Sequence, residues 1–122
     1  MIKGIGIDIE SIDRIGTLVA RYDADALQMI FTVDELQRCQ QASETAQCFT
    51  ICFVTKEAMG KALGTGLTSI DWHEIEVDVQ GKQVNISLHG KALQQATSIG
   101  ASDWLASWSA CDSQVMVLVV IQ

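Results

Sequence analysis

The segment from Phe53 to Gly66, FVTKEAMGKALGTG, constrains this chain more than any other part of the sequence. It predicts the end of a helix that runs from about Thr45 to Leu63, because Gly64 is the residue type at which helices commonly stop. Glu57 and Lys61 are four residues apart, so they stand on one face of this helix. Such a pair is also the commonest surface pair on helices, worth only about 0.2–0.5 kcal/mol. Alone it does not define a site.

The turn after this helix is rich in glycine. Gly64, Thr65 and Gly66 follow the last helical residues directly. Glycines let the backbone come close to a bound group, and free backbone N–H groups in a turn bind anions. We therefore expect the N–H groups of this turn to be free to approach a phosphate.

The N-terminal segment GIGIDI, residues 4–9, predicts a strand. Ile5, Ile7 and Ile9 share one face of it, and Asp8 points to the other. We expect the strand to be buried, and a buried carboxylate without a partner costs several kcal/mol. Asp8 is therefore expected to meet a lysine, hydrogen-bond donors or a metal ion.

The remaining pattern predicts an α+β protein with a single domain over residues 1–122. Thr32 followed by Glu35 is a capping box, which marks the start of a helix. The run from Val115 to Ile121 is apolar on both faces and is expected to be a central strand. The predicted elements are strands at 2–9, 74–79 and 84–88, helices at 12–21, 24–30, 32–39, 45–63 and 91–99, and a hairpin of 103–109 with 114–121; a loop covers 40–46 and a turn lies at Gly81-Lys82.

Composition narrows the function classes. The formal net charge of −7 argues against nucleic acid, whose binding depends on Lys and Arg. No apolar run is long enough to span a bilayer and no signal-peptide pattern opens the chain, so we expect a cytoplasmic protein without membrane contact. Cys39, Cys48, Cys52 and Cys111 match no zinc-site spacing and are expected to be reduced, mostly buried thiols.

Two separated blocks resemble the signature motifs of the holo-acyl-carrier-protein synthases, the short single-module branch of the 4′-phosphopantetheinyl transferases. The first block is residues 4–15, which contain GIGIDI and IDRI, and the second is residues 53–66. The likeness continues through FTVDEL at 31–36 and LHGKA at 88–92, so it spans most of the chain in the right order. The resemblance implies the transferase fold, in which an antiparallel sheet packs against a long helix and shorter helices.

The resemblance also implies an activity. Such enzymes move the 4′-phosphopantetheine arm of coenzyme A to a serine of an apo acyl carrier protein and release adenosine 3′,5′-bisphosphate, in fatty acid or polyketide biosynthesis. By this likeness Asp8 and Glu57 bind Mg²⁺, Glu57 and Lys61 are catalytic, and Lys61 holds coenzyme A together with the turn Gly64, Thr65 and Gly66. A water on the metal or Glu57 itself takes the serine proton, and the sequence does not decide between them.

The partners follow from the same likeness. Arg14 and Arg21 are seven residues apart on the helix after the first strand, where relatives contact the acidic carrier. Without the resemblance, these arginines read equally well as a solvated helix face. A homotrimer is implied as well, with active sites at subunit contacts; the sequence itself shows only a large apolar share and three tryptophans.

Three readings of function stay open at this point. The first is an active transferase. The second is a catalytically weakened relative that binds carrier protein or coenzyme A, because Cys52, Ala110 and Cys111 stand at family positions that are usually polar or cationic. Asp112 replaces the missing polar group if the alignment shifts by two residues. The third is an unrelated metal-carboxylate hydrolase. Intact Asp8, Glu57 and Lys61 favour the first.

Overall fold

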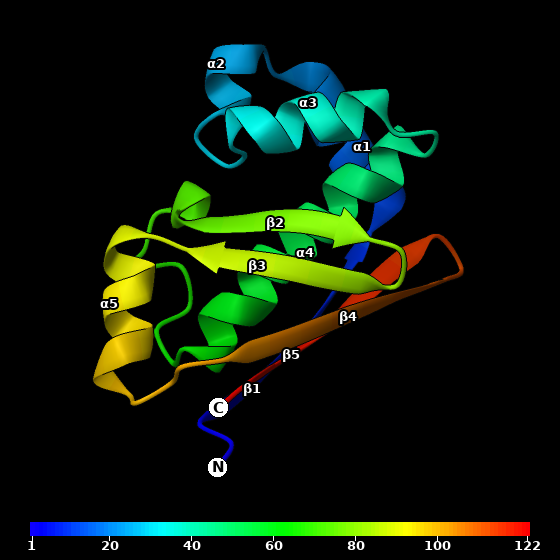
Figure 1. Ribbon diagram of the computed structural model, residues 1–122. Helices are drawn as coiled ribbons and strands as arrows, with labels where there is room; N and C mark the ends of the chain where they lie inside the picture. The colour runs from blue at the N-terminus through cyan, green and yellow to red at the C-terminus, as the bar shows by residue number, and fades with distance from the viewer.

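A five-stranded antiparallel sheet with helices on one face and at one end forms the molecule (Figure 1). The computed structural model describes all residues, 1–122, and confirms the predicted α+β class. The strand order is β1-β5-β4-β3-β2. The elements are β1 (Gly4–Ser11), α1 (Ile12–Arg21), α2 (Ala24–Leu27), α3 (Val33–Gln41), α4 (Thr45–Ala62), the 3₁₀ helix η1 (Trp72–Glu74), β2 (Ile75–Gln80), β3 (Gln83–Leu88), α5 (Gly90–Ser98), β4 (Trp104–Cys111) and β5 (Gln114–Ile121).

The long helix α4 covers one face of the sheet and provides much of the core. Strand β5 lies between β1 and β4, as its apolar run predicts, and its alternate residues Val115, Val117, Val119 and Ile121 are fully buried. In Figure 1 α4 runs behind the sheet, with α1, α2 and α3 gathered beyond one end of it. This arrangement places the second sequence block directly behind the first strand.

Strand β1 touches α4 through two glycines. A Cβ atom on Gly4 would lie 2.0 Å from the carbonyl oxygen of Ala62, and one on Gly6 would lie 1.8 Å from that of Ala58. Because residues 4, 6 and 8 share one face of the strand, the side chain of Asp8 is directed toward the same helix. The glycines therefore set how closely the first carboxylate approaches α4.

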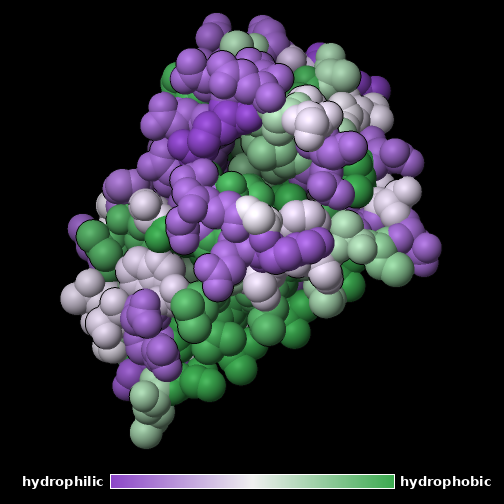
Figure 2. Space-filling view, turned by 45° about the vertical axis from the view of Figure 1, so that its right-hand side comes forward, coloured by the Kyte–Doolittle hydropathy of each residue, from purple (hydrophilic) through white to green (hydrophobic).

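The expectation that β1 is a buried strand is wrong for its isoleucine face. Ile5, Ile7 and Ile9 are 54%, 51% and 51% exposed, because β1 is an edge strand and α4 covers the glycine side. On the neighbouring strands the same bare face carries further exposed side chains, Leu105, Met116 and Leu118. Figure 2 shows a continuous hydrophobic area over the lower part of the sheet.

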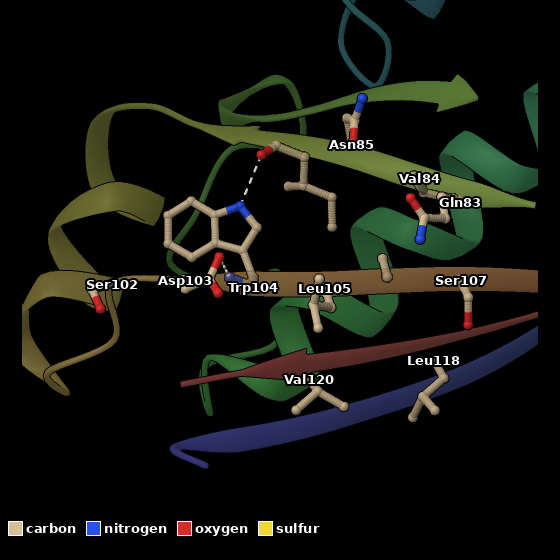
Figure 3. Close-up of a pocket in the computed structure, with 12 residues that line it drawn as sticks. Gln83, Val84, Asn85, Ser102, Asp103, Trp104, Leu105, Ser107, Leu118 and Val120 are labelled. Carbon is tan, nitrogen blue, oxygen red and sulfur yellow. Dashed lines mark hydrogen bonds between the residues drawn. The ribbon is translucent and has the colours of Figure 1, made fainter. Parts of the chain in front are cut away.

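The bare face is hollowed where β3 and β4 diverge. These strands pair only through Gln83↔Ser107 and Val84↔Ala106. Beyond that point the indole N–H of Trp104 donates to the carbonyl oxygen of Ile86 at 2.8 Å and bridges the two strands (Figure 3). The resulting cleft has a volume of about 560 Å³.

Most predicted boundaries hold within two residues, and the capping box of Thr32 and Glu35 is confirmed. The predicted helix over 24–30 ends at Leu27 and continues as turns, and η1 was not predicted. Glu35 is fully buried and pairs with buried Lys56 at 3.0 Å. Lys56 also donates to the carbonyl oxygens of Trp72 and Ile75. The ion pair and its hydrogen bonds therefore connect α3 and α4 to the start of β2. None of the helices is both long and apolar enough to cross a membrane.

Candidate active site

The two sequence blocks meet where β1 lies against α4. Nζ of Lys61 lies 3.0 Å from Oδ1 of Asp8 and donates also to the carbonyl oxygen of Ile7 at 3.1 Å. The Lys61 side chain is 52% exposed, whereas that of Asp8 is only 16% exposed. The carboxylate of Asp8 is therefore largely buried, whereas the ammonium group of Lys61 is exposed to solvent and can turn toward a ligand.

Glu57 lies one turn before Lys61 on α4 and is half-buried. Burial raises the pKa of Glu57, the nearby carboxylates of Asp8 and Glu10 raise it further, and Lys61 opposes the rise. Like charges that raise a pKa in this way must lie close together. The structure thus brings Asp8 and Glu57 into one small volume, as the family resemblance implies.

Glu10 is a third carboxylate at this site, which the sequence reasoning missed. It follows Asp8 by two residues on β1, so both side chains point to the same side of the strand. Its Oε2 lies 2.6 Å from Nη1 of Arg14. Strand alternation could have predicted the position of Glu10, because residues 8 and 10 share a face in any strand that continues past residue 9.

The expectation of free N–H groups in the turn after α4 is wrong for both glycines. The N–H of Gly64 donates to the carbonyl oxygen of Lys61 and that of Gly66 to Gly60, at 3.0 and 2.9 Å. Helix ends leave carbonyl oxygens without partners, and this turn supplies donors to them. Both glycines have positive φ, 85° and 62°. Only the N–H of Thr65 is left without a backbone acceptor in this turn.

Arg14 and Arg21 line one groove on α1, together with Leu18 and Tyr22. Both arginines are exposed. Arg14 is at the end of the groove next to the carboxylates, because its ion pair with Glu10 ties α1 to β1. The predicted shared face is therefore present, and it adjoins the candidate site.

The positions that depart from the family pattern lie in two places, the interior between α3 and α4 and the end of the β4–β5 hairpin, where the N–H of Ile12 donates to the carbonyl oxygen of Ser113. Cys52 is 1% exposed and faces Cys39 of α3. Asp112 has a φ of 52° in the turn between β4 and β5, so it does not take a strand position next to Ala110 and Cys111. Lys82 of the β2–β3 turn stacks on the Trp108 ring with its Nζ 4.2 Å from the centroid.

The candidate site thus consists of two neighbouring carboxylates and a lysine between an edge strand and a long helix, which are the side-chain types that can hold a divalent cation and a phosphate group. The sequence model of the 4′-phosphopantetheinyl transferase superfamily matches residues 4–115. This match covers nearly the whole chain, and the chain belongs to that superfamily. The resemblance drawn from the two blocks is confirmed.

Within the superfamily, this chain is similar to proteins named holo-[acyl-carrier-protein] synthase. The one from Geobacter sulfurreducens is 37% identical over 125 residues, covering 100% of this chain and 98% of the relative. The crystal structure of the Neisseria meningitidis synthase matches with a TM-score of 0.85 and 30% identity over 100% of this chain and 99% of that one. The Helicobacter pylori synthase in complex with coenzyme A matches with a TM-score of 0.81 and 26% identity, over 97% and 99% of the two chains.

Proposed function

We propose that this chain transfers the 4′-phosphopantetheine arm of coenzyme A to a serine of an apo acyl carrier protein, with Mg²⁺ as the cofactor. The observation that carries this proposal is the meeting of Asp8, Glu57 and Lys61 between β1 and α4 in a chain similar over its full length to holo-[acyl-carrier-protein] synthases. The Helicobacter pylori relative with coenzyme A supports the choice of donor.

The donor set fits Mg²⁺. This ion prefers carboxylate oxygens in small number, together with waters and substrate phosphate oxygens. Burial, followed by the neighbouring carboxylates of Asp8 and Glu10, raises the pKa of Glu57, and a divalent cation would relieve the repulsion among these carboxylates. Asp8 and Glu57 would hold the ion, which supplies charge neutralisation at the pyrophosphate of coenzyme A.

The remaining steps fall to the side chains of the site. Lys61 gives up its contact with Asp8 and stabilises the negative charge that develops on the departing phosphate, which its exposure allows. Glu57 is a side chain of the site that could accept the serine proton, because its raised pKa makes it a stronger base than an ordinary glutamate. The turn Gly64, Thr65 and Gly66 then contributes at most the N–H of Thr65 to the phosphates.

An acidic carrier protein fits the groove of α1. Arg14 and Arg21 provide positive charge along it, Leu18 and Tyr22 add apolar surface, and Asp13 and Thr17 complete its lining. The chain carries a net charge of −7, so these cations supply much of the local attraction for an acidic partner. Docking here would place the carrier serine next to the carboxylates, because Arg14 contacts Glu10.

A homotrimer accounts for the bare face of the sheet. Ile5, Ile7 and Ile9, with Leu105, Met116 and Leu118, form an apolar surface across three strands (Figure 2). Surfaces of this kind on small domains mark association sites. Sedimentation should show a species three times the 13.3 kDa chain mass. A fully active single chain would refute the trimer.

Mass spectrometry of an apo carrier protein tests the function directly. With coenzyme A, Mg²⁺ and this chain, the carrier should gain the mass of one phosphopantetheine arm, and a chelator should prevent the gain. Asp8→Ala should abolish it while the fold is kept. A chain that binds coenzyme A and carrier but gives no mass gain at saturating Mg²⁺ would be the weakened relative, and one that binds neither would belong to another reaction class.

A further inference from the structure

Three cysteine thiols meet between α3 and α4, away from the carboxylate site. Sγ of Cys39 lies 2.7 Å from Sγ of Cys48 and 3.8 Å from Sγ of Cys52. Cys39 belongs to α3, whereas Cys48 and Cys52 are one turn apart on α4. Cys39 and Cys52 are each 1% exposed, and Cys48 is half-buried. The proposed transfer reaction uses none of these thiols.

The geometry favours a pair of sulfurs over a metal centre. A Zn²⁺ ion bonded to thiolates at about 2.3 Å would hold its sulfurs roughly 3.8 Å apart from one another. The separation between Cys39 and Cys48 is far shorter than that. The group contains three sulfurs and no histidine or carboxylate, and the carboxylate of nearby Glu35 is already used by Lys56 and by backbone N–H groups. A fourth metal ligand is therefore missing.

Cys48 is the member of the cluster that solvent can reach. It lines a pocket of about 280 Å³ between α3, α4 and β2, to which Arg38, Glu44 and Asp78 also contribute. Arg38 is fixed there by its bond to the carbonyl oxygen of Val77 and its contact with Asp78. A molecule as small as hydrogen peroxide can reach Cys48 through this pocket.

The surroundings also favour the thiolate form of Cys48. Hydrogen bonds from Cys39 and Cys52 lower the pKa of Cys48 to about 4, and the charge of Arg38 lowers it further. Burial and the charge of Asp78 oppose this shift. The same contacts raise the pKa of Cys39. Since Cys48 is also the one thiol of the three that solvent reaches, and the thiolate is the reacting form of cysteine, Cys48 is assigned as the nucleophile and Cys39 as the thiol beside it.

We propose that Cys39, Cys48 and Cys52 form a peroxide-responsive thiol site, in which Cys48 is oxidised first and is then joined to Cys39 by a disulfide bond. The Cys48 thiolate attacks one peroxide oxygen, the O–O bond breaks, and hydroxide leaves as the sulfenic acid forms. The sulfur of Cys39 then attacks Cys48, the S–O bond breaks and water leaves. Two thiols thus lose two hydrogens, and one peroxide becomes two waters. Cys52, close to Cys39, can exchange into the bridge.

The test uses the whole purified protein and hydrogen peroxide. After oxidation, free thiols are alkylated and the denatured chain is cut after glutamate, which separates Cys39 from Cys48 and Cys52 because Glu44 lies between them. We expect the free thiols to fall from four to two, and the peptides 36–44 and 45–57 to be joined until a reductant is added. Trypsin would not show this, because all three cysteines lie between Arg38 and Lys56.

Variants assign the sulfurs. Cys48→Ser should slow thiol loss by about tenfold, because it removes the one thiol of the cluster that peroxide can reach. Cys52→Ser should keep the cross-link, and Cys111→Ser, which removes an exposed thiol outside the cluster, should not change the rate. Oxidation confined to Cys111, or a cross-link that forms only in denaturant, would overturn the proposal. The proposal would also be overturned if one equivalent of zinc or copper were found bound to the cluster and prevented its oxidation. No arm of the test requires transfer activity, so its result is independent of the proposed function.

Discussion

Gly6→Ala is the substitution that most directly tests how β1 positions the site. The added Cβ would lie 1.8 Å from the carbonyl oxygen of Ala58, 2.8 Å from its carbonyl carbon and 2.9 Å from the backbone nitrogen of Ala62. All three are backbone atoms near the C-terminal end of α4, so no side chain can turn aside to make room. Strand and helix must separate by at least about 1 Å before such contacts become tolerable.

The expected loss of stability is large for one methyl group. Overpacking typically costs about 1–3 kcal/mol, and a collision with helix backbone belongs at the upper end. An unfolding entropy of about 2.1 cal/mol/K per residue gives roughly 0.26 kcal/mol/K for a chain of 122 residues. A loss of about 3 kcal/mol therefore lowers Tm by roughly 12 °C.

Activity should fall as well, because Asp8 is two residues further along the same strand face. A displacement of about 1 Å between reacting groups can cost on the order of 100-fold in rate. Thermal melts at one fixed protein concentration and the carrier mass-gain assay, run below the variant's Tm, measure the two effects separately.

Gly16→Ala is the matched control. This glycine lies within α1, and its added Cβ would meet only the side chain of Ala46, at 3.3 Å. Alanine is favoured over glycine in helices by about 1 kcal/mol, so Tm should stay or rise. A Gly6→Ala protein with wild-type Tm and wild-type transfer would refute the argument that this contact sets the site.

Three further predictions concern charge. Glu57→Gln should abolish transfer yet raise the Tm of the metal-free protein at pH 7. The pKa of Glu57 is higher in the folded than in the unfolded protein, where it is 4.5, so ionised Glu57 destabilises the fold above that pH. The difference in Tm between variant and wild type should therefore vanish in melts below pH 4.5. Arg14→Glu should raise KM for the carrier far more than KM for coenzyme A, in a salt-dependent way; a change within about twofold would exclude electrostatic docking through α1. Lys56→Met should cost about 3–5 kcal/mol by leaving buried Glu35 unpaired, and adding Glu35→Gln should restore part of it in chemical denaturation.

Much of the site could be predicted because its side chains follow the two-residue period of a strand and the 3.6-residue period of a helix. Strand alternation directs Asp8 away from the isoleucines, and helical spacing puts Glu57 and Lys61 on one face. The meeting of the two segments followed from the family resemblance and not from either period. Sequence spacing says which residues share a face, but it does not say what covers that face. The isoleucines of β1 were therefore assigned to the interior although they are half exposed.

The features that sequence missed are those made by distant segments. Glu35 was recognised as a capping residue, but its burial against Lys56 depends on how α3 crosses α4. The N–H groups of Gly64 and Gly66 were expected to be free, yet they bond to the carbonyl oxygens of Lys61 and Gly60, three and six residues earlier on α4, once the turn has folded back. The cysteine cluster likewise needs the α3–α4 contact.

The carboxylate site is held together against its own repulsion. Asp8, Glu10 and Glu57 concentrate negative charge that Lys61 and Arg14 offset in part, and burial together with these neighbouring carboxylates raises the pKa of Glu57. Repulsion would push β1 away from α4, but the strand is fixed by antiparallel pairing with β5 along its whole length, Gly4 to Ser11. The rest of the core thus stabilises an arrangement that is unfavourable by itself. The proposed Mg²⁺ would bind here at little further cost, because the carboxylates are already brought together during folding.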